Sequence, residues 1–250
     1  MKFKDKVALV TGGGRDIGRS VSLRLAAEGA RVAINYCHDR ESAEATAREI
    51  ETAGGVAAVF QADVSKADQV ATLVADVQAN FGDRVDVLVN LAGGMVARRK
   101  LEEMDEAFYD QVMDLNLKSV FLVTRAVKPL MGEGGAIVTV SSIAGRDGGG
   151  PGASLYATSK GALMTLTRAW AKEFGPQGIR VNAVCPGLIG TSFHDIFSKP
   201  EGRAAVAGNT PLRREGHPDE VADAIAYLAS DEARFLTGVN LDVNGGLGFS

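Results

Sequence analysis

Short apolar runs alternate with helical patterns along almost the whole chain, and this alternation restricts the possible folds more than any other feature. The first run, Val7 to Val10, is continuously apolar, as expected of a strand buried on both faces of a sheet. Strands are predicted at residues 7–10, 31–35, 56–60, 85–89, 136–140, 179–184 and 239–243, and helices at residues 17–28, 41–52, 66–80, 105–131, 154–174 and 218–229. Such alternation predicts an α/β protein in which a parallel sheet carries helices on both faces.

The predicted elements follow one another without a linker or a low-complexity run. The 250 residues could also form two small domains, but the unbroken alternation favours a single domain over residues 1–250. Residues 188–214 are the one long stretch without clear periodicity. Loops of this length are uncommon and are often functional, so we expect a lid at approximately these residues.

Composition and charge argue against several classes of function. The net charge of −4 provides no field that would attract nucleic acid. We see no signal-peptide pattern and no run that approaches the ~18 apolar residues of a membrane helix. The only two cysteines, Cys37 and Cys185, cannot form a disulfide framework and suit a reducing cytoplasm. The three histidines are isolated, so we expect no metal site. We therefore expect a cytoplasmic protein.

A glycine-rich turn follows the first predicted strand. Its sequence is Thr11-Gly12-Gly13-Gly14-Arg15-Asp16-Ile17-Gly18, and a predicted helix begins within it. Such a turn lets backbone N–H groups approach a pyrophosphate, which the helix N-terminus also attracts. A glycine-rich turn can instead serve only tight packing, so this motif alone leaves both interpretations open.

A second group of residues has the chemistry of a catalytic site. Tyr156 and Lys160 are four residues apart in a predicted helix, so both side chains can face one site. Ser142 ends a predicted strand fourteen residues before Tyr156, at the edge of a parallel sheet where ligands bind. Asn116 lies inside a helical pattern, where a buried amide needs a specific reason.

Taken together, the turn and these four residues resemble the short-chain dehydrogenase/reductase family. The resemblance covers nearly the whole chain and implies a Rossmann-type, doubly wound sheet. It also implies an NAD(P)-dependent oxidoreductase that interconverts a secondary alcohol, or a sugar hydroxyl, and a carbonyl by hydride transfer. In this family the residues matching Tyr156, Lys160, Ser142 and Asn116 are catalytic. Tyr156 would be the general acid and base, Lys160 would stabilise its phenolate and hold the nicotinamide ribose, Ser142 would bond the oxyanion, and Asn116 would position a water.

The same resemblance implies the residues that bind the dinucleotide. Thr11-Gly12-x-x-x-x-Ile17-Gly18 matches the family turn, Asp63-Val64 matches the pair that contacts adenine, and Asn90-Leu91-Ala92-Gly93 resembles N-N-A-G with Leu91 in place of the second Asn. Pro186-Gly187-Leu188-Ile189-Gly190-Thr191 matches P-G-x-I-x-T, whose Ile backbone and Thr hydroxyl orient the nicotinamide amide. The expected cofactor site consists of Gly12, Gly14, Arg15, Ile17, Gly18, Tyr36, His38, Arg40, Asp63, Val64, Asn90, Ala92, Gly93, Tyr156, Lys160, Pro186, Gly187, Ile189 and Thr191.

The end of the second predicted strand favours NADP(H), with NAD(H) still possible. NAD-specific proteins usually place an acidic residue there, whereas this chain has Tyr36 with Arg15, His38 and Arg40 nearby. Fixed positive charges suit a 2′-phosphate. Asp39 argues against this preference, since it is an acidic residue close to the same position. Arg40 could instead begin a solvated helix.

Asp16 departs from the family turn, which usually has a glycine at this position. An Asp tolerates positive φ less freely than glycine, and its charge would repel a nearby pyrophosphate. Asp16 could act directly on the cofactor, or it could point away and cap the helix that follows. We favour the helix cap.

The sequence does not name the substrate, and three functions remain open. We favour a small-molecule substrate over a 3-oxoacyl-[acyl-carrier-protein] reductase, because neither residues 132–135 nor residues 175–178 contain a Lys or Arg that would dock an acidic carrier protein. The third possibility, a non-catalytic dinucleotide-binding sensor, is disfavoured by the intact tetrad. Arg98, Arg99 and Arg146 could meet an anionic substrate or form a solvated basic loop. A homotetramer is expected from the family resemblance alone.

Overall fold

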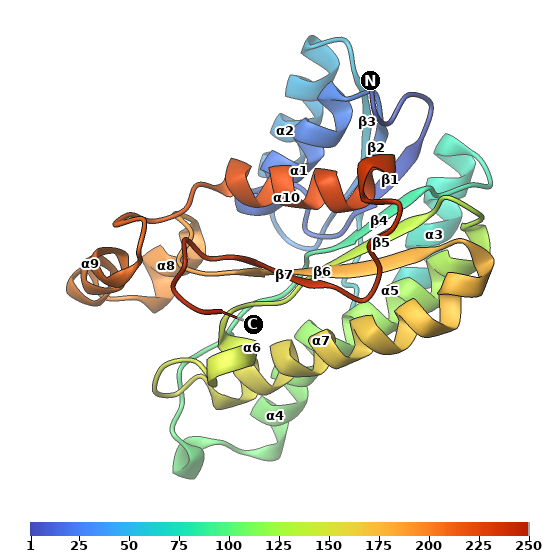
Figure 1. The fold of residues 1–250 in the computed structure, drawn as a ribbon. Coiled ribbons are helices and arrows are strands. Elements are labelled where there is room, and N and C mark those ends of the chain that lie inside the picture. The colour runs from blue at the N-terminus through green and yellow to red at the C-terminus, as the bar shows by residue number, and fades with distance from the viewer. Residues whose placement is uncertain (250) are drawn as a thin grey trace.

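The computed structural model describes residues 1–249 and is built around a seven-stranded parallel sheet (Figure 1). The strand order is β3-β2-β1-β4-β5-β6-β7, so the order reverses between β1 and β4. The strands are β1 Val7–Val10, β2 Arg31–Tyr36, β3 Val56–Gln61, β4 Val87–Asn90, β5 Ala136–Val140, β6 Arg180–Pro186 and β7 Asn240–Val243. The predicted doubly wound, Rossmann-type arrangement in a single domain is confirmed.

The central strands are apolar because both of their faces are covered. Every residue of β1, β4 and β5 is buried. One core cluster packs Val21, Leu25 and Ile225 from the helices on the first face, and a second packs Leu73 and Val123 from the helices on the other. Residues of one strand alternate between these two clusters, which is why the apolar runs are continuous rather than alternating.

Helices lie on both faces of the sheet, as Figure 1 shows. The first face carries α1 Asp16–Ala27, α2 Arg40–Thr52 and α10 Pro218–Ala229. The second carries α3 Ala67–Phe81, α4 Glu106–Met113, α5 Ser119–Val127 and α7 Ser154–Phe174. The bounds predicted for α7 and α10 agree with the structure, because each presents one long apolar face to the sheet. A short helix, α6 Ala144–Asp147, was not predicted.

Two predicted segments differ from the structure. The helix expected over residues 105–131 is α4 and α5 joined by a π-helical turn, Asp114–Lys118. Residues 188–214, expected to lack regular structure, contain α8 Ser192–Phe197 and α9 Pro200–Asn209. No residue of α8 or α9 is buried, and α8 has only six residues, so neither helix has a core-facing stripe long enough to make helical periodicity visible in a sequence.

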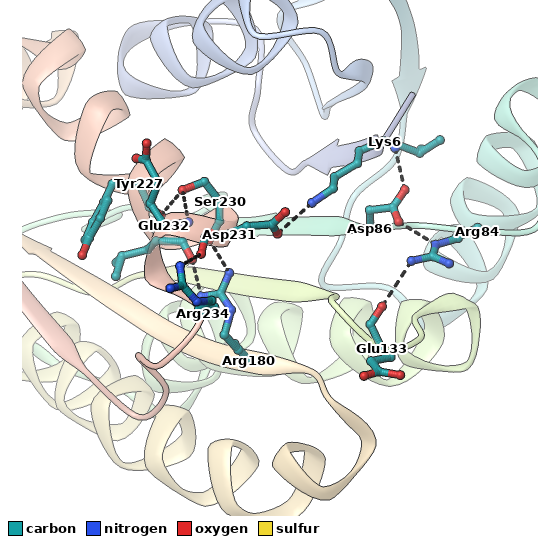
Figure 2. A network of polar contacts seen from close by, with 12 residues as sticks. Lys6, Arg84, Asp86, Glu133, Arg180, Tyr227, Ser230, Asp231, Glu232 and Arg234 are labelled. Carbon is teal, nitrogen blue, oxygen red and sulfur yellow. Dashed lines mark hydrogen bonds and ion pairs between the residues drawn. The ribbon is translucent and has the colours of Figure 1, made fainter. Parts of the chain in front are cut away.

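The amino ends of the strands are joined by a network of polar contacts, drawn in Figure 2. The buried Asp86 carboxylate accepts hydrogen bonds from the Val7 N–H (2.9 Å) and from the Arg84 guanidinium (2.6 Å). Arg84 also donates to the Glu133 carbonyl (3.3 Å). Arg180 donates to carbonyls at the end of α10 and just beyond it. These contacts tie the amino edge of the sheet together and leave the carboxyl edge free for a site.

No helix within residues 1–249 is long and apolar enough to cross a membrane.

Candidate active site

A cleft of roughly 2030 Å³ lies at the carboxyl ends of the strands. Its walls come from the glycine-rich turn, from the segments after β2, β3, β4 and β5, and from residues 186–206. Pockets for drug-sized ligands are usually about 300–1,000 Å³, so this cleft has room for a dinucleotide together with a substrate. The reversal of strand order between β1 and β4 places the cleft where ligands bind in open α/β sheets.

Tyr156 and Lys160 lie next to each other in this cleft, on one face of α7. The Lys160 ammonium is 5.7 Å from the centre of the Tyr156 ring. It donates a hydrogen bond to the Val140 carbonyl at the end of β5 (2.8 Å). Burial lowers the pKa of Lys160 to about 8, although the nearby Cys185 thiol acts in the opposite direction. An ammonium with this pKa still carries most of its charge at neutral pH.

Ser142 follows β5 and lies beside the phenol. Burial raises the pKa of Tyr156, and hydrogen bonding to the Ser142 hydroxyl acts against that rise. The Ser142 oxygen accepts a hydrogen bond from the Ala144 N–H (3.2 Å), which orients the hydroxyl. The neighbouring Ser141 hydroxyl donates to the Lys160 carbonyl (2.7 Å), so the strand end and α7 hold a fixed relative position.

Asn116 is fully buried in the π-helical turn and holds the segment that follows β4. Its amide nitrogen donates to the carbonyls of Gly94 (2.8 Å) and Val112 (2.9 Å), and its oxygen accepts from the Gly94 N–H (3.0 Å). A π-turn widens the helix, and such turns occur frequently at functional sites. A Cβ at Gly93 would lie 2.8 Å from the Asn116 oxygen and 3.2 Å from the Lys160 ammonium. Of the four predicted catalytic residues, Ser142, Tyr156 and Lys160 line one end of the cleft, and Asn116 lies directly behind its wall, bonded to Gly94.

The glycine-rich turn forms a cradle that side chains would fill. Gly12 has φ +65°, and a Cβ at Gly18 would collide with the Gly12 carbonyl. At Gly14 a Cβ would lie 2.7 Å from the Ala43 backbone of α2. The Thr11 hydroxyl accepts hydrogen bonds from two backbone N–H groups after β4 (3.0 and 3.1 Å), which fixes the turn against that segment. A closely approached backbone at a helix N-terminus fits a dinucleotide pyrophosphate.

Most of the other predicted cofactor residues line the same cleft. They are Gly12, Gly14, Arg15, Ile17, Tyr36, His38, Asp63, Val64, Ala92, Gly93, Pro186, Gly187, Ile189 and Thr191. Gly18 and Asn90 do not line it. Gly18 permits the tight turn, and the Asn90 amide donates to the Thr124 hydroxyl beneath the cleft (3.0 Å).

Comparisons with known proteins agree with this geometry. A family model described as Enoyl-(Acyl carrier protein) reductase matches residues 12–248. The 3-oxoacyl-[acyl-carrier-protein] reductase FabG of Staphylococcus aureus is 41% identical over 244 residues, covering 97% of this chain and 98% of the relative. The chain belongs to the short-chain dehydrogenase/reductase family. It is an NAD(P)-dependent oxidoreductase, as the sequence predicted.

Two solved structures of other reductases are also similar to this chain. A short-chain dehydrogenase from Burkholderia cenocepacia in complex with NADP is 35% identical, with a TM-score of 0.93 and coverage of 99% of each chain. An NADH-dependent reductase, A1-R′, responsible for alginate metabolism, is 37% identical, with a TM-score of 0.90 and the same coverage. Both cofactors therefore occur among close structural relatives of this family member.

At the end of β2, this short-chain dehydrogenase/reductase brings Tyr36, His38 and Arg15 to the cleft. Arg40 lies outside the cleft lining and is 71% exposed, and its guanidinium donates to Glu44 one helical turn further along α2 (2.7 Å). The structure thus does not bring Arg40 to the site that the sequence predicted for it. A helix-surface ion pair explains its position without a ligand.

The two carboxylates near this end of the cleft are engaged by their own segments. Asp39 is the N-cap of α2, and its carboxylate accepts a hydrogen bond from the Ser42 N–H (3.0 Å). Asp63 accepts from the N–H (2.9 Å) and hydroxyl (2.7 Å) of Ser65. Asp39, the counter-evidence in the sequence, therefore has a local structural role.

The expected role of Asp16 as a cap of α1 is wrong. Arg15 occupies the N-cap position of α1, and its side chain makes no capping bond. The Asp16 carboxylate instead accepts hydrogen bonds from the N–H (3.0 Å) and hydroxyl (2.6 Å) of Ser192, at the start of α8. Sequence reasoning missed Ser192, because no local pattern connects residues 176 positions apart.

An aromatic group on α8 covers the end of the cleft that contains Tyr156. The Phe193 ring lies 5.9 Å from the Tyr156 ring and 5.0 Å from the Phe197 ring, centre to centre. Met95 and Val96 also line the cleft here, and Val96 has φ +65°, which is unusual for a β-branched residue. Residues 94–99 were expected to border the substrate pocket, but the backbone conformation of Val96 has no signal in the residue type and was not predicted.

The three arginines considered for an anionic substrate have other partners. Arg98 lines the cleft but donates to the carbonyls of Phe197 and Pro151 (both 3.0 Å), which joins α8 to the loop before α7. Arg99 stacks over the Phe108 ring at 4.3 Å. Arg146 forms an ion pair with Asp242 (2.7 Å). Neither Arg99 nor Arg146 lines the cleft, so the anionic-substrate hypothesis loses two of its three residues.

The segments expected to dock a carrier protein lie at the other edge of the sheet. Residues 132–135 precede β5, residues 175–178 precede β6, and the Gly134 N–H donates to the Gly178 carbonyl (3.0 Å). Within the chain this is the amino edge of the sheet, whereas the cleft is at the carboxyl edge. The absence of Lys and Arg from these segments therefore says nothing about the mouth of the cleft.

Proposed function

We propose that this chain reduces the carbonyl group of a small, predominantly apolar molecule with NADP(H), and oxidises the corresponding alcohol. When bound, the nicotinamide cofactor supplies or accepts the hydride. In reduction, the Tyr156 phenol gives its proton to the carbonyl oxygen. In oxidation, the phenolate takes a proton from the alcohol.

Lys160 supports this chemistry through its charge. A free phenol has a pKa of about 10 and is a poor base at neutral pH. A buried ammonium 5.7 Å from the ring centre stabilises the phenolate more than the phenol. Ser142 donates a hydrogen bond to the oxygen on which charge develops. Asn116 fixes the Gly93–Gly94 backbone beside Lys160, and a water on its carbonyl partners would complete the proton path.

The observation that carries the substrate class is the apolar cover over Tyr156. Phe193 contacts the phenol ring, Phe197 packs on Phe193, and Arg98 holds this part of the lid to the Pro151 loop. The guanidinium of Arg98 is already bonded to two carbonyls, which leaves it poorly placed for a substrate carboxylate. A compact ketone or aldehyde of low polarity fits these surroundings best.

The preference for NADP(H) rests on Arg15 and Tyr36. Arg15 is exposed at the mouth of the cleft, and Tyr36 occupies the position where an NAD-specific protein would have a carboxylate. The nearby acidic residues are held by Ser42 and Ser65. A 2′-phosphate would meet a guanidinium and no competing free carboxylate at this position.

The second candidate function is 3-oxoacyl-[acyl-carrier-protein] reduction, which the similarity to the Staphylococcus aureus protein favours. The test compares kcat/KM for apolar ketones, aldehydes, sugars and acetoacetyl-carrier protein, each with NADPH and NADH. We expect the highest value with an apolar small molecule and NADPH. Turnover of the carrier-bound substrate at ~10⁵ M⁻¹s⁻¹ or more, far above every small molecule, would establish the second candidate instead. Dinucleotide binding without turnover of any substrate would indicate a sensor.

We also propose that residues 188–214 act as a lid, that the protein assembles as a homotetramer, and that it functions in the cytoplasm. The two free cysteines are compatible with a reducing compartment. Exposed apolar side chains on α4 and α5, Tyr109 and Phe121, support an interface on that face.

A further inference from the structure

Asp16 adopts an unusual backbone conformation in the glycine-rich turn. Its φ of +50° is in the left-handed region, where Asp and Asn are tolerated better than most residues other than glycine. The family turn that this sequence resembles has a glycine at the same position. Because glycine would adopt this conformation without strain, we expect the Asp16 side chain to make a contact that compensates for the strain.

That contact is with the first residue of the lid helix. Both Asp16 carboxylate oxygens accept from Ser192, one from the N–H at 3.0 Å and one from the hydroxyl at 2.6 Å. The N-cap residue of α8, Thr191, makes no side-chain capping bond of its own. Asp16, from a distant part of the same chain, therefore supplies the hydrogen-bond acceptor that the first turn of α8 lacks.

The contact connects two parts of the site that must act together. Asp16 belongs to the turn that fits the pyrophosphate, whereas Ser192 lies between Thr191, which lines the cofactor cleft, and Phe193, which covers Tyr156. The Arg15 guanidinium reaches this junction only at the outer limit of contact, 4.0 Å from the Asp16 carboxylate and 3.5 Å from the Ser192 hydroxyl, so the two shorter bonds between Asp16 and Ser192 hold the junction. A carboxylate would repel a phosphate, so Asp16 is poorly suited to bind the dinucleotide directly.

We propose that Asp16 is a positioning residue that tethers the lid to the glycine-rich turn and thereby strengthens dinucleotide binding by keeping the lid closed. The inference rests on dinucleotide binding in this cleft, but not on the identity of the substrate. Opening the lid requires breaking both bonds to Ser192, so the closed lid and the retained dinucleotide stabilise each other.

Hydrogen exchange tests the tether without any turnover. Asp16→Gly removes both acceptors and accommodates the backbone conformation, whereas Asp16→Asn keeps one acceptor oxygen and also tolerates positive φ. With NADPH present, we expect the amides of residues 192–198 to exchange about fivefold faster in Asp16→Gly than in the wild type. The exchange rate in Asp16→Asn should lie between those of the wild type and Asp16→Gly. Unchanged exchange in Asp16→Gly would overturn the proposal. Thermal unfolding of each variant checks that the fold is retained.

The affinity for NADPH distinguishes the tether from direct repulsion of the pyrophosphate by Asp16, because the two explanations predict opposite changes in Kd. We expect the Kd of NADPH, measured by its fluorescence, to rise about fivefold in Asp16→Gly, which corresponds to about 1 kcal/mol. Ser192→Ala should raise it about twofold alone and should add nothing in the Asp16→Gly background. If Asp16 acted only by repelling the pyrophosphate, both Asp16→Gly and Asp16→Asn would bind NADPH more tightly than the wild type. That result, or independent effects of the two substitutions, would contradict the tether.

Discussion

Lys160 lies beside the Tyr156 ring, with its ammonium 5.7 Å from the ring centre and hydrogen-bonded to the Val140 carbonyl. This arrangement keeps a positive charge buried next to the phenol while a strand end fixes its position. Burial lowers the pKa of Lys160 to about 8, so the folded state is less stable with Lys160 charged. The site therefore reduces stability in order to hold its charge where the chemistry needs it.

Replacing Lys160 should expose this cost as a dependence of stability on pH. Between pH 8 and about 10.5 the unfolded chain binds a proton at Lys160 that the folded chain has released, so the contribution of Lys160 to the stability of the wild type rises with pH. Lys160→Met lacks this rise. Relative to the wild type, the variant should lose about 3 kcal/mol of unfolding free energy between pH 7 and pH 10.5. Urea unfolding at several pH values measures it, and a difference that does not vary with pH would contradict the low pKa.

Arg15 tests the cofactor preference, and Arg40 provides the control. Arg15 lines the cleft, whereas Arg40 is held by Glu44 outside it. Loss of a charged hydrogen bond to a 2′-phosphate costs about 1.5–3 kcal/mol, so Arg15→Ala should raise the KM for NADPH at least tenfold. The KM for NADH should hardly change, and Arg40→Ala should leave both values within about twofold. A wild type with higher kcat/KM for NADH than for NADPH would reject the preference itself.

Phe193 should determine how well apolar substrates bind. Its ring covers Tyr156, so removing it exposes the substrate site to water. We expect Phe193→Ala to raise the KM for apolar ketones about tenfold, in keeping with loss of about 1.5 kcal/mol of apolar burial. The Kd of NADPH should remain nearly unchanged, because the Asp16–Ser192 contact is retained. Equal effects on polar and apolar substrates would argue against an apolar substrate class.

Phe121 tests the proposed tetramer. Its neighbours on α5, Val120 and Val123, are buried in the core, whereas Phe121 is 45% exposed. Light scattering should give a tetramer for the wild type at micromolar concentration and a smaller species for Phe121→Asp. A monomeric wild type would refute the assembly. Retention of the unfolding temperature in the variant, allowing for subunit dissociation, confirms that the core is intact.

Local patterns were enough to predict the sheet, and the family resemblance added the four residues that we propose to be catalytic. The apolar run Val7–Val10 and the amphipathic helix Ser154–Phe174 have the predicted bounds, because each is set by short-range periodicity. Tyr156 and Lys160 share a helix face through their spacing alone. The structure places Ser142 in the same cleft, and it places Asn116 directly behind the cleft wall, bonded to Gly94.

Relationships between distant residues could not be predicted in this way. The Asp16–Ser192 contact joins segments 176 residues apart, and either partner has a plausible local alternative. Arg40 could pair with a phosphate or with Glu44, and only the direction of its side chain decides. The segments before β5 and β6 are close in sequence to Ser142 and to α7, but they lie at the amino edge of the sheet, away from the cleft. Closeness in sequence to a strand or helix does not specify which of its ends a segment lies near.

Substitution of Tyr156 by Phe tests the central claim most directly. The variant removes only the phenolic oxygen and keeps the ring that packs against Phe193. We predict an unchanged fold, a Kd for NADPH within about twofold of the wild type, and a kcat lower by about 10² to 10⁴ for the best carbonyl substrate. Retention of NADPH binding together with this loss of turnover would establish Tyr156 as the acid and base. Turnover close to that of the wild type would contradict the mechanism.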